Sequence, residues 1–180
     1  MNFSITKSLF MKLRIFGFVA FAFLLFANNS IAQKTKEEKQ KEKAKQITTI
    51  VADSQHYVFV AQTAFPVTGS MRNLTGGYDV IVSKDTVNSY LPYFGKAYSG
   101  IDYGSTTSPL EFISTKFIYT SKATKKADGW NITIETKDQN DGKKLMFNIY
   151  DNGSATLLVT TTNRSQITFH GNIEAVKPKK

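Results

Sequence analysis

Four successive segments in the second half of the chain alternate apolar and polar residues, and this pattern constrains the fold most. The segments are 130–135, 144–149, 155–160 and 167–173. Because successive side chains of a strand point to opposite faces, the alternation is typical of antiparallel strands with one buried face. Asn140-Asp141-Gly142 and Asp151-Asn152-Gly153 separate the first three segments, and Asp-Gly and Asn-Gly pairs favour tight hairpins. The sequence therefore predicts antiparallel strands joined by short turns.

Earlier strands complete the predicted sheet. They are expected at 57–65, 78–83, 86–91 and 111–121, with one more near 98–104. Short spacings without intervening helices predict an antiparallel meander, which must curl or pair with a second layer to bury its apolar face and protect its edges. We therefore predict a mainly β domain over 57–176, either a small barrel or a two-layer sandwich, and the tight sequential turns favour the barrel.

A lysine-rich segment over 33–56 precedes the strands and predicts one N-terminal α-helix, from about residue 35 to 55. Ala44, Ile47 and Val51 recur at helical spacing, so the last turns are expected to pack on the β domain while the first half is solvated. The alternative is a polybasic helix at a membrane surface. Three glutamates and the lack of an aromatic face argue against that alternative.

The first 32 residues have the three parts of a removable secretory signal. Positive residues precede an apolar run from Ile15 to Ala27, and Ser30-Ile31-Ala32 places small residues where a signal peptidase reads them. The run is about 13 residues long, whereas a spanning helix needs about 20. We expect cleavage between Ala32 and Gln33 rather than a membrane anchor. The product would be a soluble exported protein, periplasmic or extracellular, without a stable membrane span.

The formal net charge of +9 is distributed unevenly. Residues 57–176 carry eleven basic and ten acidic residues, and the excess lies in the first 56 residues and the basic tail 177–180. The β domain is thus nearly neutral, and no nucleic-acid partner is expected. The chain has no cysteine, which excludes thiol catalysis, zinc–thiolate sites and iron–sulfur clusters.

Motifs of catalysis or cofactor binding are missing from the sequence. It contains no nucleotide-binding loop, nucleophile elbow or zinc-protease motif, so no cofactor and no metal are predicted. His56 at the helix–strand junction and His170 on the polar face of the last strand are interpreted as surface or packing residues. Residues 138–142 resemble the start of a calcium loop, but no glutamate closes it, and a hairpin turn explains them better. A hydrolase stays a minor alternative that would require convergent carboxylates.

The segment 90–104 is rich in aromatic residues and supplies the candidate site. Pro92 forces Leu91 out of a helical conformation and fixes a turn. One interpretation is a bent plug with its rings in the core. The other is the aromatic wall of a pocket for an apolar ligand, since pockets are typically apolar with a few polar anchors. The candidate ligand-binding residues are Tyr90, Tyr93, Phe94, Tyr98 and Tyr103.

The run Tyr-Leu-Pro-Tyr-Phe-Gly at 90–95 follows a lysine-rich start and precedes Gly153-Ser154-Ala155 and an end with Ile167 and Gly171-Asn172-Ile173. In these features the chain resembles a family of exported bacterial proteins, domain of unknown function family 4251. The resemblance covers roughly residues 35–176. It implies an exported, single-domain, mainly β or α+β protein, and no known activity, so it provides no catalytic residues.

Two functions remain open on the sequence. The first is a non-enzymatic binding module of the cell envelope that holds a small apolar or lipid-like ligand near residues 90–103. The second is a protein–protein interaction or inhibitor-like domain that binds another envelope protein through a strand edge or an aromatic patch. An internal cavity would favour the first function, and a filled interior with an exposed apolar patch would favour the second.

Overall fold

The computed structural model describes residues 38–99, 107–124 and 129–176. The chain divides into two compact units, residues 1–42 and 43–180, each considered by itself. In the first unit, the described residues 38–42 are helical and exposed. All described strands belong to the second unit. The predicted cleavage site at Ala32 and Gln33, the basic tail and Tyr103 lie outside the described residues.

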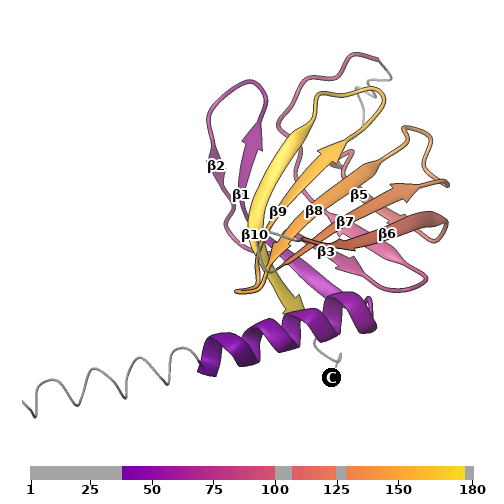
Figure 1. Cartoon of the computed structure of the whole chain (residues 1–180). Helices are drawn as coiled ribbons and strands as arrows, with labels where there is room; N and C mark the ends of the chain where they lie inside the picture. The colour runs from indigo at the N-terminus through magenta and orange to yellow at the C-terminus, as the bar shows by residue number, and fades with distance from the viewer. Residues whose placement is uncertain (1–37, 100–106, 125–128, 177–180) are drawn as a thin grey trace, which may run out of the picture. The chain divides into compact units, whose positions relative to one another are not determined.

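Ten strands among the described residues form one antiparallel sheet that curls into a nearly closed barrel (Figure 1). Their bounds are β1 (Tyr57–Pro66), β2 (Arg72–Asn73), β3 (Asp79–Val82), β4 (Val87–Tyr90), β5 (Glu111–Ser114), β6 (Phe117–Ala123), β7 (Gly129–Thr136), β8 (Lys144–Tyr150), β9 (Ser154–Thr160) and β10 (Ile167–Ala175). The order is β5-β4-β3-β1-β10-β9-β8-β7-β6, and β2 pairs with β1 beside this path. The predicted fold class is confirmed, in its barrel-like form.

The strand predicted at 111–121 is wrong as a single strand. The chain forms β5 and β6 instead, separated only by Thr115 and Lys116. β5 pairs with β4, whereas β6 pairs with β7, so the two strands lie at opposite ends of the strand order. This bend brings the two ends of the sheet together at one corner. The alternation of apolar and polar residues does not indicate which strand pairs with which. The sequence pattern therefore continues across Thr115 and Lys116, and the bend between β5 and β6 cannot be predicted from it.

Two further segments differ from the predicted strands. β2 was not predicted and extends a hairpin from β1 through Thr63↔Asn73 and Ala64↔Arg72. The strand expected near 98–104 is not present at residues 98 and 99, and the rest of it lies outside the described residues. Just before it, Ala97 forms an isolated bridge with Arg164. This bridge ties the chain after β4 to the β9–β10 loop.

Apolar side chains fill the inside of the barrel. Phe147 is fully buried and packs edge-on against Tyr57 and Phe59, with ring centroids 6.2 Å and 5.7 Å away. Ile47 and Val51 belong to the same core, as their helical spacing predicts. The helical residues 43–48 and the π-helix η1 (Thr49–Asp53) therefore cover one end of the barrel (Figure 1).

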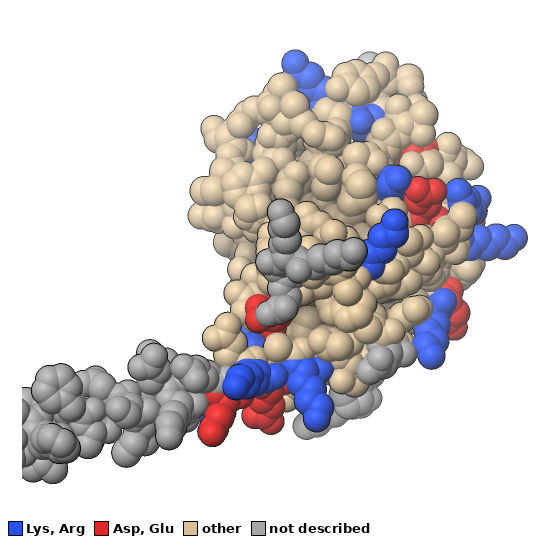
Figure 2. All heavy atoms as spheres, viewed as in Figure 1, with Lys and Arg blue, Asp and Glu red and all other residues tan. Residues whose placement is uncertain are grey.

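The surface of the β domain carries charged side chains of both signs, in agreement with its nearly neutral net charge. On the face shown in Figure 2, uncharged residues predominate over the β domain, and basic and acidic side chains lie side by side along its edge. In the described part of the chain, no helix is long and apolar enough to cross a membrane.

Candidate functional site

Tyr90 and Tyr98, two of the predicted binding residues, are exposed. Tyr90 ends β4, is 47% exposed, and stacks on Tyr78 with ring centroids 5.6 Å apart. The side chain of Tyr98 is 71% exposed, while its backbone N–H donates to the Asn163 carbonyl at 2.8 Å. Neither ring belongs to the buried core or to the half-buried side chains packed against it.

Tyr93 and Phe94 are half-buried and pack against the core from the rim of the barrel. The Tyr93 hydroxyl lies 2.9 Å from the carbonyl oxygens of Lys96 and Ser165 and 3.0 Å from Ser165 Oγ. The Arg72 guanidinium of β2 lies 4.7 Å from the centroid of the Phe94 ring. The segment after β4 is thus fastened to β2 and to the β9–β10 loop.

The inward-facing positions become polar at the end of the barrel that carries the β7–β8 turn and the β9–β10 loop. One layer deeper, the cross-strand neighbours are all buried and apolar: Ile134, Leu145, Val159 and Ile167. Two residues closer to this end of the barrel, the same alternation gives three further residues. They are Thr136 after Ile134, Lys143 before Leu145 and Thr161 after Val159. The apolar interior therefore ends in a polar layer that contains a lysine.

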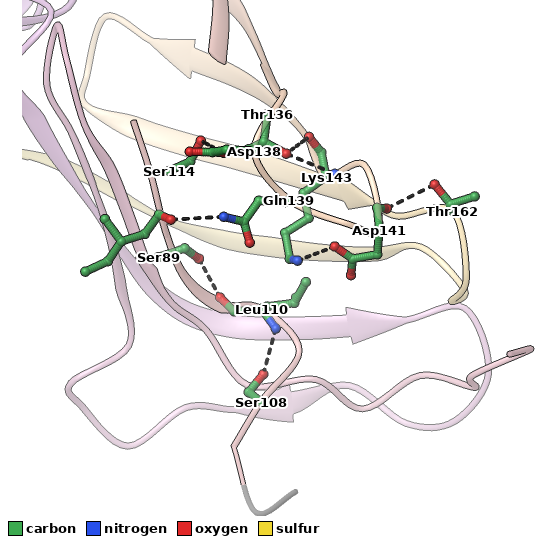
Figure 3. A network of polar contacts seen from close by, with 11 residues as sticks. Ser89, Ser108, Leu110, Ser114, Thr136, Asp138, Gln139, Asp141, Lys143 and Thr162 are labelled. Atoms are coloured by element: carbon green, nitrogen blue, oxygen red, sulfur yellow. Dashed lines mark hydrogen bonds and ion pairs between the residues drawn. The ribbon is translucent and has the colours of Figure 1, made fainter. Parts of the chain in front are cut away.

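Lys143 is only 6% exposed, and its ammonium group pairs with the carboxylate of Asp141 (Figure 3). The ammonium also lies 5.0 Å from the centroid of the Phe112 ring. Thr136 holds the backbone here, because its hydroxyl donates to the Lys143 carbonyl and accepts from the Lys143 N–H, both at 3.1 Å. Lysine is among the residues least often fully buried, so this position is unusual.

Some polar groups around this ion pair are hydrogen-bonded, and others have no hydrogen-bond partner among the described residues. The Thr162 N–H and hydroxyl both donate to the Asp141 carbonyl, at 2.9 Å and 3.0 Å, and so join the β7–β8 turn to the β9–β10 loop. The hydroxyl of Thr161 is buried and has no hydrogen-bond partner among the described residues. An ammonium group has three N–H donors, of which the Asp141 oxygen takes one.

Asp138 fastens the corner where β5 meets β6. Its Oδ1 accepts from Ser114 Oγ at 2.5 Å, and its Oδ2 accepts from the N–H groups of Thr115 and Lys116 at 2.8 Å and 3.1 Å (Figure 3). The hydrogen bond from Ser114, followed by that from the Thr115 backbone, lowers the pKa of Asp138 to about 2. Residues 138–142 thus lie in the turn between β7 and β8, as the sequence predicts, and the structure adds the contacts by which Asp138 holds the corner.

The outer face of β1, β3, β4 and β5 carries apolar side chains. Cross-strand pairing places Val58 beside Ile81, and Asn88 between Ile81 and Ile113. Ile113 is 62% exposed. We call the outer apolar patch the set of outward residues Val58, Ile81, Tyr90 and Ile113.

Both histidines lie on the surface, as the sequence predicts. His56 Nδ1 is 3.0 Å from Ser83 Oγ, which joins the helix–strand junction to the β3–β4 turn. The exposed ring of His170 lies 4.4 Å from the Phe65 ring. Within the described ranges, no group of three potential metal ligands comes together.

Lys143, Asp141 and Thr161 were not among the predicted site residues. The sequence does contain a signal for the first of them, because Lys143 has the same alternation as the buried Leu145, Phe147 and Ile149. A lysine that continues an inward-facing series indicates a charge at the end of the interior. Its partner Asp141 lies in a turn, where the alternation of residues does not predict whether a side chain points inward or outward.

Together the fold and this end of the barrel define a class: small, barrel-like antiparallel β domains with an N-terminal helix. The family described as Domain of unknown function (DUF4251) matches residues 38–173, and the chain belongs to it. The crystal structure of a DUF4251 family protein from Bacteroides eggerthii DSM 20697 is similar, with 12% sequence identity and a TM-score of 0.52. The match covers 76% of this chain and 87% of that chain, and it supports the fold alone. None of the curated proteins matches the chain.

Proposed function

We propose that this protein is an exported, non-enzymatic binding module of the cell envelope, which holds a small, largely apolar ligand at the Lys143 end of the barrel. The observation that carries the proposal is the buried Lys143 at the end of an apolar interior. Because side chains fill that interior, the ligand lies in the depression beside Lys143 rather than inside the barrel. Ligand pockets are typically apolar with a few well-placed polar groups, and barrel mouths are common positions for them.

Stability alone gives a poor reason for this ion pair. Desolvation of two charges offsets much of their attraction, and packed apolar residues of similar volume stabilise a protein as well or better. Because stability does not explain this buried ion pair, its charge is a candidate for binding. In this account Lys143 anchors the ligand, Thr136 fixes the backbone of Lys143, and Tyr93 and Phe94 form the rim.

Native mass spectrometry tests the proposal on the protein purified without detergent from its own host. We expect a mass above that of the denatured chain, lost on denaturation. The double variant Asp141→Asn/Lys143→Met removes both charges and should stay folded but lose the extra mass. Lys122→Met, on exposed β6, makes the same change of side chain elsewhere and should keep it. A bare chain mass for the wild-type protein would contradict the proposal.

A second candidate function is protein–protein interaction through the outer apolar patch. It is favoured by the exposure of Tyr90 and Ile113 on adjacent strands and by the filled interior of the described strands. Exposed apolar groups of this kind often mark contact surfaces. A wild-type protein that carries no ligand but captures an envelope protein through this patch would favour this function.

A further inference from the structure

We infer that the ligand carries a carboxylate, which Lys143 and Thr161 bind together in place of Asp141. This inference rests on the proposed function and names the chemical class of its ligand: a small amphiphile with an acidic head and an apolar body.

The first step concerns donors without acceptors. The Lys143 ammonium donates to one Asp141 oxygen and has two further N–H groups. The buried Thr161 hydroxyl has no partner among the described residues. Lys143 comes just before β8 and Thr161 just after β9, and the pairing of Lys144 with Thr160 brings the two residues to the same end of these neighbouring strands. Unpaired buried donors are costly, so a group that accepts from both is favoured here.

The second step concerns the charge of that acceptor. The Asp141 side chain is 20% exposed, against 7% for Lys143, so it is the partner that can turn to water. A ligand carboxylate that replaces it leaves the number of charges around the ammonium unchanged. A neutral head group would leave the buried ammonium without its counter-ion, and a cationic head group would repel it. Charge complementarity therefore selects an acid.

The third step concerns the apolar body of the ligand. The centroid of the Phe112 ring lies 5.0 Å from the ammonium group, and Leu110, the residue before β5, is buried. Thr136, Lys143 and Thr161 also line a depression of about 380 Å³, together with the charged residues Glu135, Lys137 and Lys144 and with Gly142, Thr160 and Thr162. The depression itself is polar, so the body of the ligand would contact the Phe112 ring beside the ammonium group.

Isothermal titration calorimetry with octanoate and 1-octanol tests the inference, because the two probes share a chain and differ in the charge of the head group. We expect one octanoate per protein, bound at least about tenfold more tightly than 1-octanol. Thr161→Val replaces the hydroxyl with a methyl group of similar size, and it should weaken octanoate binding several-fold without changing 1-octanol binding. Asp141→Asn/Lys143→Met should abolish the preference for octanoate, and Lys122→Met should retain it.

The outcomes separate this inference from the proposed function. Equal affinity for both probes would overturn the carboxylate but leave an apolar ligand site at the barrel end. A preference for octanoate that survives in the double variant would overturn the assignment to Lys143. If neither probe binds, the inference fails, and native mass spectrometry of the wild-type protein then decides the proposed function by itself.

Discussion

At the scale of single residues, two polar side chains at the same end of the barrel have different tasks. Asp138 is exposed, and its carboxylate joins three donors of the β5–β6 corner. Lys143 is buried, and its ammonium group pairs with Asp141 beside the Phe112 ring. The hydrogen bonds to the Asp138 carboxylate account for that residue by a structural role. A structural role does not account for the buried Lys143 ammonium, because two of its N–H donors are unused among the described residues. Binding is therefore assigned to Lys143 and closure of the sheet to Asp138.

Asp138 should make the stability of the protein dependent on acid pH. Because its folded pKa of about 2 lies below the ordinary value of 3.8, its stabilising effect is complete above about pH 4 and is lost as the pH falls through about 2. Urea unfolding between pH 6 and pH 2 should show this loss in the wild-type protein. Asp138→Asn should be less stable at pH 6 and lose less on acidification. Asp85→Asn, in the exposed β3–β4 turn, should behave like wild type; if Asp138→Asn does so as well, the corner is held by other contacts.

At the scale of elements, the sequence predicts the strands whose residues alternate between apolar and polar, but it does not predict where the chain bends between two strands. The strands from β7 to β10 follow from the period-two pattern and from the turns at Gly142 and Gly153, where φ is positive. The division between β5 and β6 does not follow, because it is set by the donors that Ser114 and its neighbours present to Asp138, 24 residues later. The π-helix η1 also departs from the uniform helix that the spacing predicts. Long-range contacts decide these features.

The end of the helix should be an integral part of the core. Ile47 is 4% exposed and belongs to the same buried cluster as the strands. Ile47→Ala should lower the free energy of unfolding by about 2–4 kcal/mol, through lost burial and the cavity left behind. Gln46→Ala, at an exposed neighbouring position, should change it by less than about 0.5 kcal/mol. Chemical denaturation measures both, and equal stabilities would show that the helix packs only loosely on the barrel.

At the scale of the β domain, the barrel has two unlike ends. Helical residues cover one end with apolar side chains, and the polar layer of Thr136, Lys143 and Thr161 lies at the other. The aromatic segment predicted from the sequence runs along this second end, fastened by Tyr93 to Ser165. Sequence reasoning could locate the segment by composition, but not the ion pair, because Lys143 and Asp141 belong to a different turn. The site depends on the closure of the sheet.

The central claim is that this polar end, rather than the outer face, receives a ligand. Amide chemical-shift mapping of the ¹⁵N-labelled protein with octanoate tests it most directly. The account predicts saturable shifts centred on Phe112, Thr136, Lys143 and Thr161, with little change at Val58 and Ile81. Shifts confined to the outer apolar patch, or no saturable shift at any amide, would contradict it.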